Sequence, residues 1–389
     1  MPKERVEFNK KTSLLNDKKI ILGVTGSISA VESVRLIHEL RRHGAEVFPV
    51  ITESAKRIIH PYSLEYASGN RVVEELTGAI EHVRLVEDSD LFLIAPSTAN
   101  TISKISLGID DSTVTSVFSN ALGKIPIVVV PAMHINMYTN PIIRKNIDVL
   151  KSFGVIFLDP LIDEEKAKIA DYRSITAEVI RALNTQLKGK KIFIIGGSSY
   201  ENIDDVRVIS NNSTGETSID IATMAYYMGA DVDLLLGNVS VEVPPFLDYE
   251  KFTNIDSLVS KIDSIKKSDA VIVPAALSDF TTEKIDGKIS TEGPFSIKLK
   301  PTPKFLKKLR EKYKGVLVGF KAEYGVSKDE LIERARRRMS EYSLDMVVAN
   351  DLKDVRVGYT KVIVIRGRKE TEIEGDKLEV AGRILKLLA

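Results

Sequence analysis

The sequence predicts an α/β protein of two domains, each built on a parallel sheet covered by helices on both faces. Three observations indicate this class. The length of 389 residues corresponds to two or three domains at roughly 150 residues each. Residues 18–27 (KKIILGVTGS) and 190–199 (KKIFIIGGSS) are alike, and each reads as a buried strand that runs into a glycine turn. After each of them, continuous apolar strands alternate with helical stretches, which is the pattern of a covered parallel sheet.

The elements of the first half follow in order. An amphipathic helix is predicted over residues 30–43, ended by Gly44. Strands are predicted over residues 45–51, 91–95 and 125–130. The polar stretch 184–190 (NTQLKGK) is the best candidate for a linker.

The second half repeats the pattern, with strands predicted over residues 231–236, 270–274, 315–320, 346–349 and 362–365. We therefore expect an N-terminal extension over residues 1–17, a first domain over 18–183, a linker over 184–190 and a second domain over 191–389.

Composition excludes several classes of function. The net charge of +1 creates no field for nucleic acid or a membrane surface, so neither is an expected partner. With 43% hydrophobic and 28% charged residues, the chain is typical of a globular protein. The absence of cysteine excludes disulfides, thiolate metal sites and cysteine nucleophiles. The N-terminus lacks an apolar signal core, and no run approaches the ~18 apolar residues of a membrane span, so a cytoplasmic enzyme is expected.

Two clusters of small polar residues follow predicted strands of the first half. Gly26, Ser27, Ile28 and Ser29 form a glycine turn at a helix start, where backbone N–H groups and hydroxyls suit a phosphate. The full G-x-G-x-x-G spacing is absent, so a plain tight turn explains this cluster equally well. The second cluster occupies a strand's carboxyl end, where open α/β sheets bind ligands, and comprises Ser97, Thr98, Ala99 and Asn100.

Two of the five histidines are candidates for chemistry. His38, His43 and His60 read as surface residues. His82 lies in IEHVRL (80–85), and a neutral imidazole is a natural proton carrier near pH 7, although a lone histidine is more often structural. His134 lies in PAMHINM (131–137), directly after a predicted strand, and therefore at the ligand-binding edge of the sheet.

Taken together, these motifs resemble a known family. IEHVRL (80–85), APSTANT (95–101), KISLGIDD (104–111) and PAMHINM (131–137) resemble the flavin-dependent phosphopantothenoylcysteine decarboxylases. The second half resembles the phosphopantothenate-cysteine ligases in GGSSYENIDDVR (196–207), ISNNSTG (209–215), AALSDF (275–280), KIDGKI (284–289), PTPKFL (301–306), GFKAE (319–323) and AND (349–351). From about Lys18 onward, the chain thus resembles the bifunctional decarboxylase/ligase enzymes of coenzyme A biosynthesis.

The resemblance implies a flavodoxin-like or Rossmann-like flavoprotein domain followed by a Rossmann-like ligase domain. The ligase half would join cysteine to 4'-phosphopantothenate through an acyl-nucleotidyl intermediate, using Mg²⁺ and a nucleoside triphosphate, commonly CTP. The flavin half would decarboxylate the product, 4'-phosphopantothenoylcysteine, to 4'-phosphopantetheine, with FMN as the electron carrier. The family also implies a homo-oligomer with trimeric flavin domains and dimeric ligase domains, a dodecamer in all.

The resemblance also carries roles onto residues of this chain. In the first half, His82 is implied as the catalytic imidazole, and His134, Met137 and Lys168 as substrate-binding residues. The implied FMN contacts are Gly26, Ser27, Ile28, Ser29, Thr52, Ser54, Ser97, Thr98, Ala99 and Asn100. In the second half, Lys288 and Asn211 are implied as catalytic, and Asp279 as the acid near both nucleotide and Mg²⁺. The remaining implied substrate contacts of this half are Ala275, Ala276, Lys304 and Phe320.

The chain departs from the family pattern at three places. His134 stands where asparagine is usual, and an imidazole N–H can donate the same hydrogen bond to a substrate carboxylate. The clamp segment 163–173 (DEEKAKIADYR) lacks the usual cysteine, so either Tyr172, Lys168 or ordered water supplies that acid, or the decarboxylase is impaired; we favour the replacement. Residues 164–166 by themselves read as part of a solvated charged helix. Asn212 and Glu216 stand where basic residues are common, which leaves triphosphate affinity and base choice open.

Two alternatives remain at this stage. A nicotinamide-dependent two-domain oxidoreductase is suggested by the paired strand-glycine openings, but G-x-G-x-x-G and an acidic ribose partner at the expected offset are missing. A catalytically inactive flavin-binding regulatory protein on the same scaffold is suggested by His134 and the missing cysteine. Bound flavin would distinguish the first alternative, and product formation the second.

Overall fold

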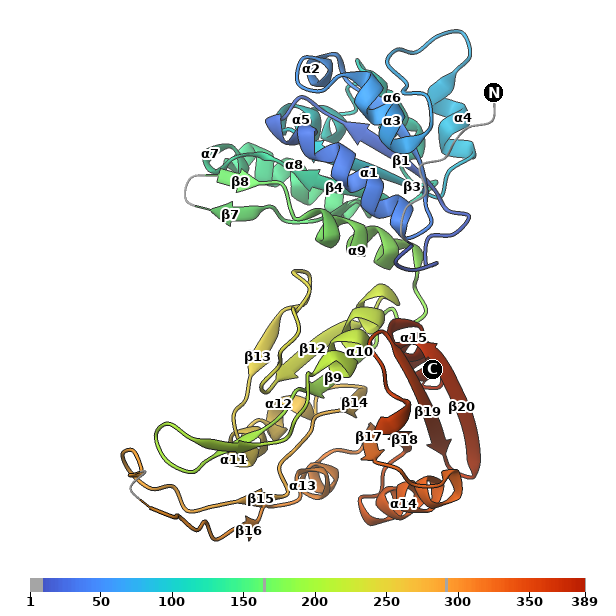
Figure 1. The fold of residues 1–389 in the computed structure, drawn as a ribbon. Coiled ribbons are helices and arrows are strands. Elements are labelled where there is room, and N and C mark those ends of the chain that lie inside the picture. The colour runs from blue at the N-terminus through green and yellow to red at the C-terminus, as the bar shows by residue number, and fades with distance from the viewer. Residues whose placement is uncertain (1–9, 164–165, 291–292, 389) are drawn as a thin grey trace. The chain divides into compact units, whose positions relative to one another are not determined.

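The chain folds into two compact units, Met1–Asn184 and Thr185–Ala389 (Figure 1). The structure is a computed structural model that describes residues 10–163, 166–290 and 293–388. The expected N-terminal extension is described from residue 10 onward, and residues 1–9 lie outside the described part.

The first unit is built on a five-stranded parallel sheet in the order β2-β1-β3-β4-β6. Its strands are β1 (Lys19–Val24), β2 (Glu46–Ile51), β3 (Leu91–Ser97), β4 (Ile127–Pro131) and β6 (Ile156–Phe157). This is the flavodoxin-like 2-1-3-4-5 order, whose strand order reverses between β1 and β3. Every residue of β3 is buried, because helices cover both faces of the sheet. The predicted fold of the first domain is confirmed.

Helices and a small second sheet complete the first unit. The helices are η1 (Ile28–Glu32), α1 (Ser33–Arg42), α2 (Glu53–Lys56), α3 (Pro61–Ser68), α4 (Glu81–Glu87), α5 (Ala99–Ser106), α6 (Thr113–Ala121), α7 (Ile135–Tyr138), α8 (Pro141–Ser152) and α9 (Tyr172–Leu183). The predicted helix over 30–43 thus begins as a turn of 3-10 helix and continues as α1. The small antiparallel sheet consists of β5 (Met133–His134), β7 (Leu161–Asp163) and β8 (Lys166–Lys168).

The residues before β1 pack onto the end of α1. Leu15 is fully buried, and its N–H donates to the carbonyl of His43 at 2.9 Å. Gly44 ends the helix with a φ of +103°, and a Cβ there would lie 2.2 Å from the Asn16 side chain. The end of α1 is therefore covered by this N-terminal strap, residues 10–17, rather than by solvent.

The second unit is built on an eight-stranded sheet in the order β13-β12-β9-β14-β17-β18-β19-β20. Its strands are β9 (Lys191–Gly196), β12 (Asp231–Leu236), β13 (Tyr249–Lys251), β14 (Ala270–Val273), β17 (Val316–Glu323), β18 (Met346–Asp351), β19 (Tyr359–Arg366) and β20 (Lys369–Asp376). The six strands from β13 to β18 are parallel in the 3-2-1-4-5-6 Rossmann order. The predicted Rossmann-like second domain is confirmed.

One strand direction differs from the prediction. The strand predicted over residues 362–365 is β19, which runs antiparallel to β18, and β20 pairs antiparallel with β19. Only residues 352–358 connect β18 to β19, whereas a parallel pair requires a crossover of about a dozen residues or more. The expectation that this last strand continues the parallel sheet is therefore wrong.

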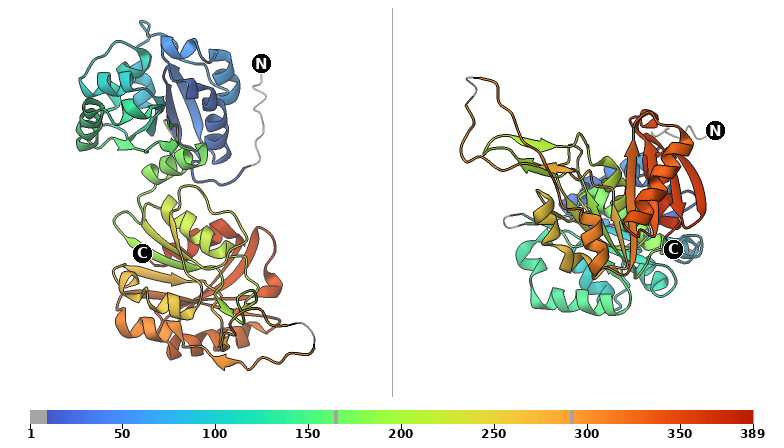
Figure 2. Two further views of the ribbon diagram at one scale, coloured as in Figure 1. Left: turned by 90° about the vertical axis from the view of Figure 1, so that its left-hand side faces the viewer. Right: turned by 90° about the horizontal axis from the view of Figure 1, so that it is seen from below.

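Helices cover both faces of the second sheet, and two short hairpin-like pairs extend from it (Figures 1 and 2). The helices are α10 (Glu216–Tyr227), α11 (Ile255–Val259), α12 (Ile262–Ile265), α13 (Phe305–Lys312), α14 (Lys328–Glu341), η2 (Leu352–Asp354) and α15 (Lys377–Lys386). The short pairs are β10 (Tyr200–Asn202) with β11 (Val208–Ser210), and β15 (Phe280–Thr281) with β16 (Lys300–Pro301). None of the helices in the described part of the chain combines the length and the apolar character needed to cross a bilayer.

Candidate functional site

The loops after β1 and β3 meet at the edge of the first sheet where the strand order reverses. The Thr25 hydroxyl donates to the carbonyl of Pro96 at 2.8 Å, and the N–H of Thr98 donates back to that hydroxyl at 3.1 Å. These two bonds bring the cluster Gly26–Ser29 beside the cluster Ser97–Asn100. In open α/β sheets, the crevice at such a reversal is the usual ligand site.

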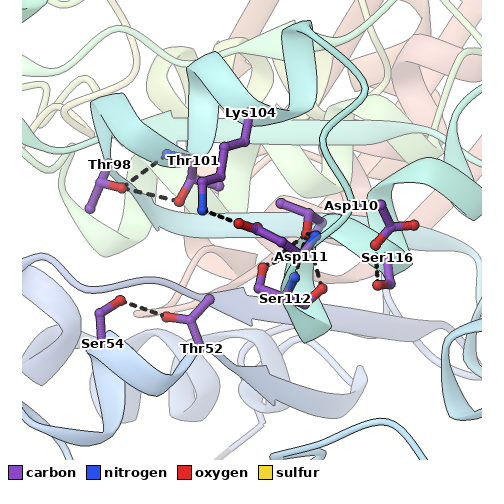
Figure 3. Close-up of polar contacts among 10 residues, drawn as sticks. Thr52, Ser54, Thr98, Thr101, Lys104, Asp110, Asp111, Ser112 and Ser116 are labelled. Carbon is purple, nitrogen blue, oxygen red and sulfur yellow. Dashed lines mark hydrogen bonds and ion pairs between the residues drawn. The ribbon is translucent and has the colours of Figure 1, made fainter.

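The loop after β2 approaches the same glycine turn. A Cβ at Gly26 would lie 2.5 Å from the Ser54 hydroxyl oxygen, so only glycine allows this approach. The Thr52 and Ser54 hydroxyls lie 3.1 Å apart (Figure 3). The structure therefore gathers hydroxyl groups from three loops, including both residues predicted from the loop after β2.

Some polar side chains in this region already have hydrogen-bond partners within the described part of the protein, and one buried hydroxyl does not. The Thr98 side chain caps α5 by accepting the N–H of Thr101 at 3.2 Å, and Lys104 pairs with Asp111 at 2.5 Å (Figure 3). By contrast, the Ser97 hydroxyl is buried and has no hydrogen-bond partner among the described residues. A buried hydroxyl is normally paired, so a ligand group or a water molecule fits here. The donor set of hydroxyls and backbone N–H groups suits a phosphorylated cofactor.

His82 lies in the first turn of α4. Among the described residues, its hydrogen bond joins it to α6 and not to this hydroxyl cluster. Its backbone carbonyl accepts from the Asn120 amide at 3.1 Å, which joins α4 to α6. The ring is half-buried, and its Nδ1 atom is buried without a partner in the described part of the chain. The backbone at His82 is thus joined to α6, and the ring keeps hydrogen-bonding capacity at Nδ1.

His134 lies in β5, beside the clamp segment. β8 pairs with β5, with Lys166 opposite His134, and β7 pairs with β8. The predicted charged helix at 164–166 is therefore wrong for Lys166, which lies in a strand because its backbone joins this ladder. Glu164 lies outside the described residues. The structure thus places the segment that carries Lys168 against the strand that carries His134.

The His134 ring also caps α7. Its Nδ1 atom accepts the N–H of Asn136 at 3.3 Å, which places the proton of the neutral ring on Nε2. Met137, in the same short helix, is 48% exposed, and Tyr172 begins α9 after the clamp. His134 therefore has a structural role that the sequence pattern did not indicate.

In the second unit, the loops after β9 and β14 meet at the corresponding reversal of strand order. The N–H of Ala276 donates to the carbonyl of Gly197 at 2.8 Å, and the N–H of Ser278 donates to the Ser199 hydroxyl at 2.8 Å. The Asn211 amide, after β11, donates to the carbonyl of Leu277 at 3.1 Å. The predicted residues Ala276 and Asn211 are therefore at the same edge of the sheet.

A cavity of about 70 Å³ opens beside these loops. Four residues predicted from the resemblance line it, namely Ala275, Asp279, Lys304 and Phe320. Lys304 pairs with Asp279 at 2.5 Å, and the Thr302 hydroxyl donates to the carbonyl of Ser278 at 2.6 Å. Residues from three separate strand ends thus form one polar cavity.

Among the cavity residues that sequence reasoning missed are Arg338 and Tyr342, which lie one turn apart on α14 and at its end. The guanidinium of Arg338 lies over the Tyr342 ring at 5.5 Å from its centre, and burial raises the pKa of Tyr342. The Arg338 Nε atom is buried without a partner among the residues described. The i, i+4 spacing of arginine and tyrosine is the sequence pattern that could have indicated that these two side chains lie together.

Lys288 does not line this cavity. Its side chain is exposed in the loop between β15 and β16, and Ala276 and Asn211 border the cavity without lining it.

The described residues contain no group of three or more histidine, aspartate or glutamate side chains arranged to hold a metal ion.

Comparison with known proteins defines the class first. Residues 8–184 match the family described as Flavoprotein, and residues 187–389 match the family described as the DNA/pantothenate metabolism flavoprotein C-terminal domain. The chain is therefore a two-domain protein of the flavoprotein class, with the flavoprotein domain first.

Curated relatives then define the particular family. The chain is 44% identical over 366 residues to the coenzyme A biosynthesis bifunctional protein CoaBC of Thermococcus kodakarensis, covering 91% of this chain and 90% of that protein. It is 41% identical to the CoaBC protein of Methanocaldococcus jannaschii (96% and 94% covered) and 32% identical to that of Bacillus subtilis (97% and 98%). The chain belongs to the CoaBC family of bifunctional coenzyme A biosynthesis enzymes, which confirms the family expected from its motifs.

Two solved structures are similar to parts of the chain. The C-terminal domain of a CoaBC protein is 31% identical, covers 52% of this chain and 96% of that structure, and gives a TM-score of 0.45. The FMN-dependent cysteine decarboxylase SpaF is 28% identical, covers 42% of this chain and 97% of that structure, and gives a TM-score of 0.39.

Proposed function

We propose that the C-terminal domain ligates cysteine to 4'-phosphopantothenate and that the N-terminal domain decarboxylates the resulting 4'-phosphopantothenoylcysteine to 4'-phosphopantetheine. The observation that carries this proposal is membership of the CoaBC family over nearly the whole chain. It is supported by a polar cluster at the strand-order reversal of each sheet. Nothing in the family assignment favours the nicotinamide-dependent alternative.

FMN is the proposed cofactor of the N-terminal domain. The proposed contacts are the residues gathered at the sheet edge, which are Gly26, Ser27, Ile28, Ser29, Thr52, Ser54, Ser97, Thr98, Ala99 and Asn100. The close approach at Gly26 and the unpaired Ser97 hydroxyl support a phosphorylated ligand there. Bound FMN would supply the redox chemistry of the reaction, a reversible uptake of electrons from the substrate thiol that would give the electrons left by carbon dioxide a place to go.

Two histidines are proposed to handle the decarboxylase substrate. His82 carries the proton of the thiol, because its imidazole lies in the first turn of α4 and keeps hydrogen-bonding capacity at Nδ1. His134 donates Nε2–H to the substrate carboxylate, because its Nδ1 is occupied by the N–H of Asn136. Met137 and Lys168 complete the substrate contacts, and Lys168 or Tyr172 supplies the acid that cysteine supplies elsewhere in the family.

In the ligase domain, we assign the cavity beside β9 and β14 to the nucleoside triphosphate, with CTP as the expected choice. Lys304 and Arg338 supply positive charge for its phosphates, and Phe320 supplies an aromatic wall. Asp279 is the proposed Mg²⁺ ligand, with phosphate oxygens and water completing the shell, as is usual for Mg²⁺. Lys288 and Asn211 are assigned to formation and conversion of the acyl-nucleotide, and Ala275 and Ala276 to substrate contact.

The proposed assembly has trimeric flavin domains and dimeric ligase domains, twelve chains in all. Exposed apolar side chains around the arm that carries β15 and β16 support pairing of ligase domains. They are Val206, Val208, Phe280, Ile285, Phe295, Ile297 and Leu299. Patches of this kind on a globular domain mark interaction surfaces.

A coupled assay tests the proposed function. The protein is incubated with 4'-phosphopantothenate, cysteine, Mg²⁺ and each nucleoside triphosphate in turn, and the products are followed by mass. We expect 4'-phosphopantetheine and carbon dioxide, with CTP as the best triphosphate. Ligation without decarboxylation would overturn the N-terminal assignment, whereas bound flavin without either product would favour an inactive regulatory protein.

A further inference from the structure

The turn between β10 and β11 is hydrogen-bonded to the loop that carries Lys288. Figure 2 shows the segment of β10 and β11 running beside the arm that carries β15 and β16. The arm's loop contributes backbone groups on both sides of Lys288, and the turn contributes two carboxylates. The contacts between them include several hydrogen bonds and one ion pair.

Asp205 holds the residue before Lys288. Its carboxylate accepts the N–H of Gly287 at 2.9 Å, and its own N–H donates to the Gly287 carbonyl at 3.1 Å. The other carboxylate oxygen pairs with Lys284 at 2.5 Å. The Lys284 ammonium, and to a smaller extent the N–H of Gly287, lowers the pKa of Asp205 below its usual value. The carboxylate is therefore charged at neutral pH.

Asp204 holds the residue after Lys288. It is 1% exposed, and one of its oxygens accepts the N–H of Ile289 at 3.1 Å and a guanidinium N–H of Arg207 at 2.6 Å. The other oxygen accepts the N–H groups of Val206 and Arg207, which closes the turn. Arg207 also donates to the carbonyl of Ile289 at 3.2 Å.

The backbone on either side of Lys288 is thus fixed, while its exposed side chain is left to reach outward. The same hairpin continues through β11 to Asn211, whose amide contacts Leu277 at the edge of the cavity. The turn therefore fixes the Lys288 loop relative to the segment that carries the other proposed catalytic residue of the ligase.

We propose that Asp204 and Asp205 are positioning residues that hold Lys288 for formation of the acyl-nucleotide. This inference rests on the role proposed above for Lys288. A positioned group contributes to catalysis by its orientation, and a displacement of about 1 Å costs on the order of a hundred-fold in rate. Loss of the clamp lowers kcat for this half-reaction and leaves the KM for the triphosphate nearly unchanged, because the cavity itself is intact.

The test uses the full-length protein with 4'-phosphopantothenate and CTP but without cysteine, and measures pyrophosphate release. We expect Asp205→Ala to lower kcat about ten-fold to a hundred-fold, and Asp205→Asn, which retains an oxygen acceptor for Gly287, to recover most of it. Lys284→Ala removes the ion pair from the other side and is expected to give a smaller loss. Asp263→Ala, which breaks an exposed aspartate–lysine pair on α12, is the matched control and is expected to leave the rate unchanged.

Two further measurements separate positioning from general damage. Trypsin is expected to cleave after Lys288 faster in Asp205→Ala than in the parent, while the thermal midpoint stays the same. Residues that act as one unit give non-additive losses, so Asp205→Ala combined with Lys288→Gln is expected to be no slower than Lys288→Gln alone. Additive losses, or a parental rate and cleavage pattern in Asp205→Ala, would overturn the clamp. A parental rate in Lys288→Gln would instead overturn the role of Lys288, and this inference with it.

Discussion

The imidazole of His82 is the residue on which the decarboxylase half depends most directly. The His82 backbone is joined to α6 through Asn120, and the Nδ1 atom of its ring keeps unused hydrogen-bonding capacity. We expect His82→Asn to retain flavin and ligase activity but to abolish carbon dioxide release from 4'-phosphopantothenoylcysteine, because the amide cannot transfer the proton. Flavin absorbance and product mass measure the two outcomes.

Arg84→Gln, in the same helix and exposed, is the control for this prediction and is expected to decarboxylate like the parent. Decarboxylation by His82→Asn within a few-fold of the parent would show that His82 is only structural.

The two roles of His134 can be separated by substitution. Asparagine can both cap α7 and donate to a carboxylate, so His134→Asn is expected to retain much activity. His134→Leu loses the cap and the donor, and a lost bond to a charged group costs about 1.5–3 kcal/mol, or roughly ten-fold to a hundred-fold in rate. His134→Asp keeps the cap without the donor and is expected to be as slow as the leucine variant.

Decarboxylation rates across pH, with flavin content as the control, decide this prediction for all four proteins. A fast aspartate variant would show that His134 acts only as the helix cap. Equal activity of the leucine variant and the parent would remove His134 from both substrate binding and capping, and Asn136 or the clamp around Lys168 would then be the next candidates.

At the scale of elements, the N-terminal strap is held to α1 by a buried carboxylate. The Glu39 side chain is 3% exposed and pairs with Lys11 at 2.6 Å. Burial opposes its ionisation, but hydrogen bonds from His43 and Lys11 prevail and lower the pKa of Glu39 to about 2. Since this folded-state pKa lies below the unfolded value, the stabilisation is complete above about pH 4.5 and is lost as the pH falls toward 2.

Glu39→Gln is therefore expected to destabilise the protein by about 1–3 kcal/mol at pH 7, with a smaller difference from the parent at pH 3. Urea unfolding at both pH values measures this. Glu53→Gln, which removes an exposed partner of Lys56, is the control and is expected to cost less than about 0.5 kcal/mol. A Glu39→Gln effect that is equal at pH 3 and pH 7 would contradict the assignment.

Helix α10 carries an acid whose pKa is raised rather than lowered, Asp220. Asp220 lines a cavity of about 50 Å³ between α10, α15 and the sheet, and its Oδ2 atom is buried without a partner among the described residues. Burial, aided by the nearby Glu216, raises the pKa of Asp220 to about 7. Because the unfolded value is 3.8, the folded state binds the extra proton between about pH 4 and 7, and stability falls as the pH rises through this window.

Asp220→Asn is therefore expected to be more stable than the parent at pH 8, by up to 3–4 kcal/mol in order of magnitude, and to lose this advantage near pH 4. Thermal unfolding across pH measures the difference. Asp248→Asn, an exposed acid of the same domain, is expected to follow the parent. A larger advantage of the asparagine variant at pH 4 than at pH 8 would contradict a raised pKa at Asp220.

At the scale of the whole molecule, the boundary between the two units has a testable position. Leu187, within the predicted linker, is 3% exposed, and its N–H donates to the carbonyl of Met228 at 2.8 Å. It therefore belongs to the second unit, which begins at Thr185. We expect the fragment 185–389 to form the acyl-nucleotide at the rate of the full chain, because that unit contains its own sheet and cavity.

A fragment of residues 189–389 loses the Leu187 contact and is expected to be less stable by about 1.5–3 kcal/mol. Pyrophosphate release and urea unfolding of the two fragments measure both effects. An inactive but folded fragment 185–389 would show that the ligase requires the first unit.

Local sequence patterns were sufficient for the strands that begin each unit. β1 and β9 are mostly apolar, and such runs are buried on both faces wherever a parallel sheet is covered. The direction of β19 was mispredicted because the composition of a strand does not show whether it pairs parallel or antiparallel. The short connection after β18 requires the antiparallel direction. β20, which is polar apart from Ile373 and Gly375, was missed because only its outer position in the sheet allows such a sequence.

The sequence by itself determined the fold class and the family, because motifs are contiguous and local spacing is preserved along the chain. Only the tertiary structure decided how separate segments meet. It joined the loops after β1, β2 and β3, added Arg338 and Tyr342 to the ligase cavity, and placed β8 of the clamp segment beside His134. It also showed that Asp204 and Asp205 hold the Lys288 loop. These contacts join residues that are tens of positions apart in the sequence, and no local pattern specifies them.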